Sequence, residues 1–346
     1  VLSQFFRTFL AVLTPVLNSE LGATAADLSL ASGLWFGAFA LMQIPVGWAL
    51  DRFGPRWTAA VLLTLGGGGG AVWFAMAQSS LDVQVAMVLI GAGCAPVLMA
   101  SFYIFARLFR PAMFGTLAGV VLGVGMAGNL VGSIPLALAV EGLGWRQSLW
   151  VMAVVSIVVA LGIAAFVKDP PKVAGDAQSQ KGSLLDVLKI PAIWLIFPLL
   201  IVNYAPAAGI RGFWAGPYMQ EVFGLNASGI GMVTFWMAAA MMVGSFAYGP
   251  MDRIFGTRKW VIVAGNLLGA VCLLGLWKFG DNAVFTSAIL LFGIGLFGLS
   301  FPLIMAHGRS FIPQHLIGRG VTLLNLFSIG GVGFLQWLTG RMYVAS

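Results

Sequence analysis

Long apolar segments alternate with short polar loops along the whole chain. Most of them contain roughly 20 residues, which is the length that an α-helix needs to cross the hydrocarbon core of a bilayer. The pattern therefore predicts eleven membrane-spanning helices. Their expected bounds are residues 1–17, 28–50, 56–77, 81–107, 112–140, 146–168, 191–220, 226–250, 259–279, 283–307 and 317–340.

The composition agrees with a membrane protein. Hydrophobic residues make up 60% of the chain and charged residues only 8%, whereas charged residues make up about a quarter of an ordinary soluble domain. The 46 glycines and 15 prolines suit closely packed, kinked helices better than the strands of a membrane barrel. The expected fold class is all-α and integral to the membrane, with the lipid bilayer as a partner.

One polar segment interrupts the apolar pattern. Residues 169–189 are rich in Pro, Gly, Ser and Gln, a composition typical of linkers. This linker is expected to divide the chain into an N-terminal six-helix half, residues 1–168, and a C-terminal half, residues 190–346, with five visible helices.

A charged loop of the same pattern occurs once in each half. Residues 47–57 read GWALDRFGPRW and residues 249–260 read GPMDRIFGTRKW. Other residues repeat at the same spacing of about 202, which indicates an internal duplication. The further matches are Gly22 with Gly224, Gly91 with Gly293, Arg107 with Arg309, and Pro111 with Pro313.

Most of the 18 Lys and Arg residues fall in loops on one side of the predicted helices. Cytoplasmic loops of membrane proteins carry such an excess of basic residues. We therefore place the linker in the cytoplasm, beneath an inner or plasma membrane. The net charge of +7 follows from this topology and does not indicate nucleic acid as a partner.

The chain resembles the major facilitator superfamily over nearly its whole length. The resemblance implies a 12-helix fold of two pseudo-symmetric six-helix bundles, in which this chain would have an incomplete first helix and no twelfth. It also implies a monomer, with a substrate path between the halves lined mainly by helices 1, 4, 7 and 10. The residues that carry it are Gly47, Asp51, Arg52, Gly54 and Arg56, and in a weaker second copy Asp252, Arg253, Gly256 and Arg258.

In this superfamily the first charged loop braces helix 2 against helix 11 while the cytoplasmic side is closed. The resemblance assigns Asp51, Arg52, Arg56 and Arg107 to this brace, with Arg107 as the relay partner at the end of helix 4. Arg309 holds the matching position in the second half. Retention of basic residues on the cytoplasmic side is an alternative reason for the loop cations.

Two positions depart from the superfamily pattern. Met87 stands four residues before Gly91, where the helix 4 signature usually has a proton-linked arginine. The helix 5 antiporter signature expects Gly-Pro, but residues 123–132 read GVGMAGNLVG, with Asn129 in place of the proline. The sequence therefore lacks both signatures.

All 11 Asp and Glu residues fall in loops or at the ends of predicted helices. A proton-driven symporter generally needs a carboxylate inside the membrane, where desolvation raises its pKa. Exchange or uniport is therefore expected in place of proton symport. His307 is either a substitute for that carboxylate or a packing residue near the end of helix 10.

Two arginines lie inside predicted helices, Arg7 in helix 1 and Arg211 in helix 7. An arginine at mid-membrane costs roughly 2.5–3.5 kcal/mol, so it usually faces a cavity or a partner. With no acidic residue inside the helices to neutralise them, the two arginines predict a site for an anion. The alternative is that they snorkel or bind backbone carbonyls.

Polar residues at helical spacing accompany both arginines. Gln4 precedes Arg7 by three residues and Tyr204 precedes Arg211 by seven, so each pair projects from one side of its helix. We predict that the arginines hold the anionic group and that Gln4, Tyr204 and Asn203 orient the ligand. The pattern resembles the organophosphate and sugar-phosphate antiporter branch, which uses one arginine from each of these helices.

The expected function is secondary active transport of a small organic anion, phosphorylated or carboxylate, by rocker-switch alternating access. No catalytic, metal or cofactor site is expected, because no nucleophile and base are arranged for an enzyme. One alternative is a transporter-like sensor or assembly factor that binds without flux. Another is a copper importer that holds Cu(I) through Met237 and Met241 on helix 8.

Overall fold

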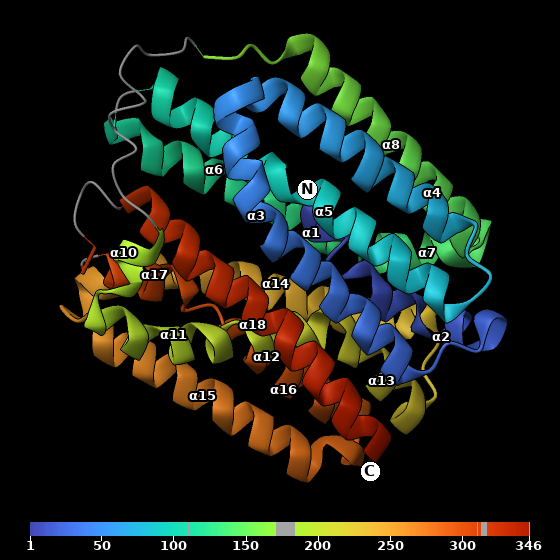
Figure 1. The fold of residues 1–346 in the computed structure, drawn as a ribbon. Coiled ribbons are helices and arrows are strands. Elements are labelled where there is room, and N and C mark those ends of the chain that lie inside the picture. Colours follow the sequence, from blue (N-terminus) through green and yellow to red (C-terminus); the bar gives the residue numbers. More distant parts are fainter. Residues whose placement is uncertain (110, 171–183, 310, 313–316, 346) are drawn as a thin grey trace. The chain divides into compact units, whose positions relative to one another are not determined.

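The computed structural model describes residues 1–109, 111–170, 184–309, 311–312 and 317–345. These residues form helices joined by turns (Figure 1). The N-terminal half contains α1 (Leu2–Phe5), α2 (Phe9–Leu21), α3 (Ala25–Leu62), the π-helical η1 (Leu63–Gly68), α4 (Gly69–Ala75), α5 (Ser80–Leu108), α6 (Pro111–Val131), α7 (Ile134–Leu143) and α8 (Trp145–Phe166).

The C-terminal half is built in the same way from helices with short interruptions. It contains α10 (Leu184–Leu188), α11 (Pro191–Asn203), α12 (Ala205–Gly209), the π-helical η2 (Ile210–Trp214), α13 (Ala215–Phe223), α14 (Ala227–Ile254), α15 (Arg258–Phe279), the 3-10 segment η3 (Gly280–Asn282), α16 (Val284–Phe297), α17 (Phe301–Arg309) and α18 (Ile317–Ala345).

The predicted all-α membrane fold is confirmed. Within the described ranges, nine helical stretches are long and apolar enough to cross a membrane, and Phe9–Leu21 and Val284–Phe297 are shorter apolar helices. These eleven stretches fall where the hydrophobic pattern places eleven helices. The apolar length requirement of a bilayer therefore accounts for the architecture.

Four of the predicted membrane spans contain a break in the helix. Helix 1 breaks between α1 and α2, helix 5 between α6 and α7, helix 7 between α11 and α12, and helix 10 between α16 and α17. In the last three cases the second residue of the new helix is proline: Pro135, Pro206 and Pro302. Proline has no N–H to donate and fits the first turn of a helix, so it favours a restart at these points.

The first charged loop is also more helical than predicted. The helix that begins at Ala25 continues to Leu62, with non-helical backbone at Gly54 (φ 83°, ψ 165°). Pro55 follows at once and starts the next helical segment. The first charged loop, between helices 2 and 3, is therefore a sharp kink at one glycine.

The repeat predicted from the sequence has a backbone counterpart. Gly22 and Gly224 have φ values of 62° and 65°, and Gly54 and Gly256 have φ values of 83° and 63°. The first pair forms the left-handed C-caps of α2 and α13, and the second pair lies in the two charged loops. Only glycine adopts these values without strain, so the same local requirement recurs at a spacing of 202.

The chain divides into two compact units. Unit 1 comprises Val1–Pro171, Gly212–Phe235 and Gly333–Ser346, and unit 2 comprises Lys172–Arg211 and Trp236–Val332. In unit 1, a Cβ on Gly91 would clash with the carbonyl oxygen of Trp35; in unit 2, a Cβ on Gly295 would lie 2.8 Å from the carbonyl oxygen of Met237. Helix 4 thus packs on helix 2, and helix 10 on helix 8, through a glycine in each case.

Unit 1 also joins later segments of the chain to the N-terminal helices. Ser29 Oγ donates a hydrogen bond of 2.6 Å to the carbonyl of Gln336 in α18. The Ser228 N–H donates to Glu141 at 3.1 Å. A Cβ on Gly216 would clash with the carbonyl oxygen of Ala11. The ends of helices 7, 8 and 11 opposite the linker are thereby closely packed against helices 1, 2 and 5.

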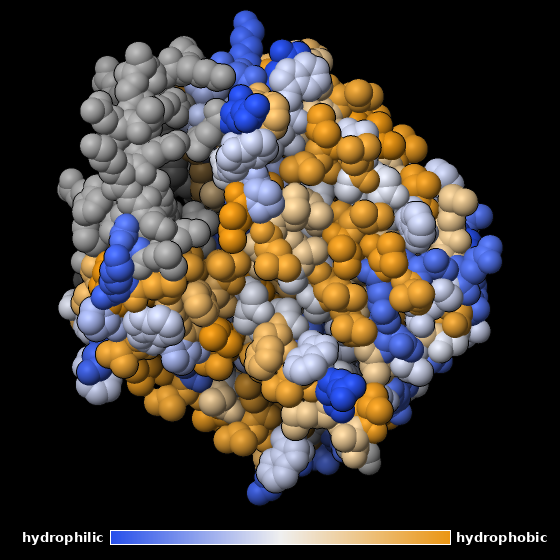
Figure 2. Space-filling view, in the orientation of Figure 1, coloured by the Kyte–Doolittle hydropathy of each residue, from blue (hydrophilic) through white to orange (hydrophobic). Residues whose placement is uncertain are grey.

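Hydrophobic side chains also cover the outer surface of these helices. In Figure 1, α4 and α8 run side by side, and Figure 2 shows apolar residues over this region. Trp73, Val154, Val158 and Leu161 are among the exposed large side chains there. An apolar surface of this kind is what contact with lipid requires.

The Gly54 kink predicts a stability difference between the two loops. A Cβ at Gly54 would lie 2.6 Å from Oδ1 of Asp169, whereas a Cβ at Gly256 would meet nothing within 4 Å. We expect Gly54→Ala to lower the free energy of unfolding by about 1–3 kcal/mol, and Gly256→Ala by less. Unfolding in mixed detergent micelles measures both values. Equal losses would contradict the steric role of Asp169.

Candidate functional site

Arg7 lies in the break of helix 1, between α1 and α2. Its guanidinium carbon is 4.8 Å from the ring centre of Phe39 and 5.2 Å from that of Trp35, both on helix 2. Its Nε is buried and has no hydrogen-bond partner in the described part of the chain. The positive charge is thus held against two aromatic rings, with a donor left over for a ligand.

A cavity of about 430 Å³ opens beside Arg7 within unit 1. Helices 1, 3, 4, 5 and 6 contribute to its lining, and its polar side chains include Ser3, Gln4, Arg7 and Ser101. No Asp or Glu is among the described residues that line it. Since the charge of Arg7 has no acidic counterpart there, the cavity suits a negatively charged ligand.

The structure brings Gln4 and Arg7 to the same cavity, as their spacing predicts. Thr14, seven residues or two helical turns after Arg7, donates to the carbonyl of Leu10 at 3.2 Å. The break between α1 and α2 separates Thr14 from the other two. Cys94 also lines the cavity and has no disulfide partner.

Arg211 lies in the π-helical segment η2 and is fully buried. π-Helical turns inside α-helices are frequent at functional sites because they redirect side chains. Tyr204 lies in the break between α11 and α12, with its ring centre 6.2 Å from that of Phe301. Tyr204 and Arg211 therefore both sit at irregular backbone of unit 2.

Asn203 is part of a buried polar cluster in unit 2. Its Nδ2 donates to Asn266 Oδ1 at 2.8 Å and to Ser300 Oγ at 2.9 Å. Asn266 Nδ2 in turn donates to the carbonyl of Ile262 at 2.8 Å. The cluster joins the breaks of helices 7 and 10 to helix 9, and sequence reasoning missed both partners because their contacts are long-range.

The first charged loop is tied to the end of helix 6. The Arg56 N–H donates to Asp169 Oδ1 at 2.9 Å, and Arg56 Nε donates to the carbonyl of Ala164 at 2.6 Å. Arg52 instead stacks on Trp48 and Phe53. Arg56 therefore anchors helix 3 to helix 6 and the start of the linker.

Several predicted gating residues can be placed only in part. Gly47 lies within α3 and Arg258 begins α15, with an exposed side chain. Gly256 has the positive φ described above. The side chains of five others lie outside the described part of the structure: Asp51, Arg107, Asp252, Arg253 and Arg309.

The remaining candidates have packing contacts. His307 meets the ring of Phe311 edge-on at 5.1 Å. Met237 and Met241 are buried, and both lie close to Gly295 where helices 8 and 10 meet. These contacts favour a packing role for the two methionines over a copper site.

Comparison with known proteins decides the family. The sequence pattern of the Major Facilitator Superfamily matches residues 1–336. The chain belongs to this superfamily.

Individual members of the superfamily are similar over most of the chain. A "Probable sulfoacetate transporter" of Cupriavidus necator is 24% identical, with 96% of this chain and 84% of that protein covered. The hexuronate transporter of Bacillus subtilis is 23% identical, covering 79% of this chain and 69% of that protein. Both relatives are named as transporters of organic anions, and the chain is a membrane transporter, not an enzyme.

The superfamily fold is also found among solved structures. A bacterial homologue of the human lysosomal transporter Spinster, in an inward-facing and unoccupied conformation, matches with a TM-score of 0.79 and 18% identity. The match covers 99% of this chain and 80% of that one. At this identity the likeness establishes the fold alone.

The aromatic contact of Arg7 predicts an energetic coupling. In a double-mutant cycle, Arg7→Gln and Phe39→Leu should couple by about 0.5–2 kcal/mol, because the ring quadrupole attracts the guanidinium. Phe36→Leu is the matched control, since Phe36 is also buried and contacts Trp35 at 5.0 Å. Unfolding in mixed micelles gives the values. A coupling no larger than that of the control would contradict the interaction.

Proposed function

We propose that the chain is a secondary active transporter that moves a small organic anion by rocker-switch alternating access. The observation that carries this proposal is the cavity at Arg7, where a half-buried cation has a buried Nε without a partner among the described residues and no described acidic neighbour in the lining. The relatives named for sulfoacetate and hexuronate support the same class of ligand. The ligand class is thus a carboxylated, sulfonated or phosphorylated metabolite.

In this proposal the charged group of the ligand binds to arginine. Arg7 in the N-terminal half and Arg211 in the C-terminal half are the proposed ligand-binding cations. A guanidinium fork matches the geometry of two oxyanion oxygens, which an ammonium does not. Gln4, Tyr204 and Asn203 orient the rest of the ligand, the last through its cluster with Asn266 and Ser300.

Exchange of one anion for another, or uniport, is the mode that the sequence favours over proton symport. All 11 acidic residues lie in loops or at predicted helix ends, so no carboxylate is available inside these helices to carry a proton. A second anion on the return journey would neutralise the arginines in both directions. The protein would act as a monomer in the inner or plasma membrane, with the linker in the cytoplasm.

Gating is assigned to two regions. On the cytoplasmic side, Asp51 with Arg52, Arg56 and Arg107 would steady the outward-open state, with Asp252, Arg253, Arg258 and Arg309 in the matching positions. On the outer side, the packing of α13 on α2 at Gly216 would form the closed gate. Opening of one region while the other is closed gives alternating access.

The two arginines predict the first transport result. Arg7→Ala and Arg211→Ala should each lower anion uptake into proteoliposomes by at least tenfold, because each removes a charge-assisted contact of about 1.5–3 kcal/mol. Arg7→Lys should restore only part of the uptake, since lysine keeps the charge and loses the fork. Sulfoacetate, tartrate, a hexuronate and glycerol phosphate are the probes.

Lys278→Ala is the control for this experiment, because Lys278 is an exposed cation at the end of α15. Its uptake should match that of the unaltered protein. Undiminished uptake by Arg7→Ala would overturn the arginine site. Saturable binding of a probe without flux would favour the sensor alternative.

The outer gate predicts a second result. Gly216→Val should hold the outer side open, because the larger side chain overpacks the contact with Ala11 at a cost of about 1–3 kcal/mol. In a background without Cys94 and Cys272, a Thr14→Cys thiol should then react faster with a membrane-impermeant reagent. Gly142→Val is the control, since a Cβ there meets nothing within 4 Å. Equal labelling in the two variants would contradict this gate.

A further inference from the structure

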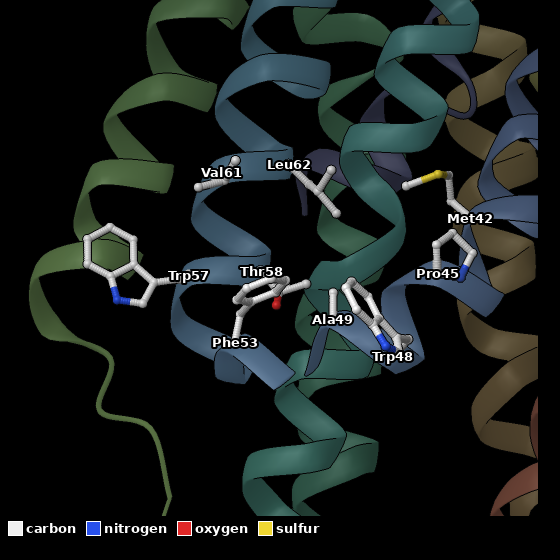
Figure 3. A pocket seen from close by; sticks show the side chains of 9 residues that line it. All are labelled: Met42, Pro45, Trp48, Ala49, Phe53, Trp57, Thr58, Val61 and Leu62. Carbon is white, nitrogen blue, oxygen red and sulfur yellow. The ribbon is translucent and has the colours of Figure 1, made fainter. Parts of the chain in front are cut away.

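A groove of about 550 Å³ lies along helices 2 and 3, next to the Gly54 kink of unit 1 (Figure 3). Of its nine lining residues, Thr58 alone carries a polar side-chain group other than an indole N–H. In the close-up, Met42, Pro45 and Trp48 approach the groove from helix 2, and Trp57, Val61 and Leu62 from helix 3.

Three aromatic residues at one end of the groove are at least half exposed. Trp48, Phe53 and Trp57 have exposed fractions of 57%, 53% and 50%, whereas Trp35 on the same helix is fully buried. Tryptophan collects at the depth of the lipid headgroups, where its ring is in contact with both apolar and polar surroundings. The aromatic end of the groove therefore marks the membrane interface on the side of the charged loop.

A cation is positioned at this aromatic end. The guanidinium carbon of Arg52 lies 5.3 Å from the ring centre of Trp48 and 5.8 Å from that of Phe53. Arg52 is exposed, and no described acidic side chain is paired with it. The guanidinium of its neighbour Arg56 already donates through Nε to the carbonyl of Ala164. Among the described residues Arg52 has ring contacts alone, so its guanidinium can hold a phosphate at the mouth of the groove.

Thr58 adds a polar group inside the groove. Its hydroxyl oxygen is buried and has no hydrogen-bond partner among the described residues. A buried hydroxyl without a partner is unfavourable, so an acceptor that reaches it gains a hydrogen bond. Thr58 lies one helical turn deeper than Pro55, at the depth where the ester oxygens of a phospholipid follow its phosphate.

We propose that this groove binds one anionic phospholipid of the cytoplasmic leaflet. The phosphate lies on Arg52, an ester oxygen accepts a hydrogen bond from Thr58, and an acyl chain lies along Met42, Val61 and Leu62. The cytoplasmic leaflet is rich in anionic lipid, which basic groups at its surface attract. From Pro55 to Leu62 the helix rises by about 10 Å, which accommodates the upper part of an acyl chain. The inference does not depend on anion transport.

Native mass spectrometry of the full chain, released from detergent with added lipid, tests the proposal. Phosphatidylglycerol and phosphatidylcholine with identical acyl chains are the probes, and the affinity for the first bound lipid is measured. The unaltered protein should bind phosphatidylglycerol several-fold more tightly. Arg52→Gln should reduce that affinity by about fivefold and leave the affinity for phosphatidylcholine unchanged, because one interfacial arginine is removed.

Two further variants distinguish binding of lipid in the groove from general attraction of anionic lipid to positive charge. Ala49→Phe fills the groove and should lower the affinity for both lipids while Arg52 is retained. Lys259→Ala is the matched control: it removes an exposed cation that stacks on Trp260 at 5.6 Å in the second charged loop, and it should change neither affinity.

Three outcomes would overturn the assignment. The first is equal binding of the two lipids by the unaltered protein, and the second is a preference that survives Arg52→Gln. The third is a dimer that forms in place of lipid binding and is lost in Ala49→Phe, because the groove would then be an interface between two copies of the chain.

Discussion

The cost of an unsatisfied backbone group in lipid governs this structure. Regular helices satisfy every N–H and C=O internally, so irregular backbone is tolerated only where protein surrounds it or a polar cavity lies beside it. The breaks of helices 1, 7 and 10 obey this constraint: one adjoins the Arg7 cavity, and the other two meet at Asn203 and Ser300. The breaks of these three helices therefore coincide with polar chemistry inside the protein.

Close helix packing is the second consequence of the same environment. Lipid chains are as apolar as leucine, so helices associate through contact area and not through exclusion of water. Glycine at the crossing points brings backbones together, as Gly91 does at Trp35 and Gly295 at Met237. The equivalent helices of the two halves use the same device, which is what a duplicated ancestral bundle would retain.

The sequence was sufficient for the architecture and only partly sufficient for the site. Eleven helices could be predicted because the bilayer imposes one length on every span. The breaks in the helices could not be predicted, because a proline does not by itself mark a break. Pro206 lies at the start of a new helix, whereas Pro15 and Pro198 lie inside unbroken helices. Gln4 and Arg7 could be paired from their spacing. The contact of Arg7 with Trp35 and the hydrogen bonds of Asn203 with Asn266 and Ser300 could not be predicted. These contacts join helices that are distant in the sequence, and the local pattern of residues does not reveal them.

The anchor between Arg56 and the end of helix 6 has a mechanical consequence. Asp169 is the residue through which helix 6 passes into the linker, and it is bonded to the backbone of helix 3 beside the Gly54 kink. The end of helix 6 and the junction of helices 2 and 3 are therefore held together at one point. A displacement of any one of these three helices at this point is transmitted to the other two.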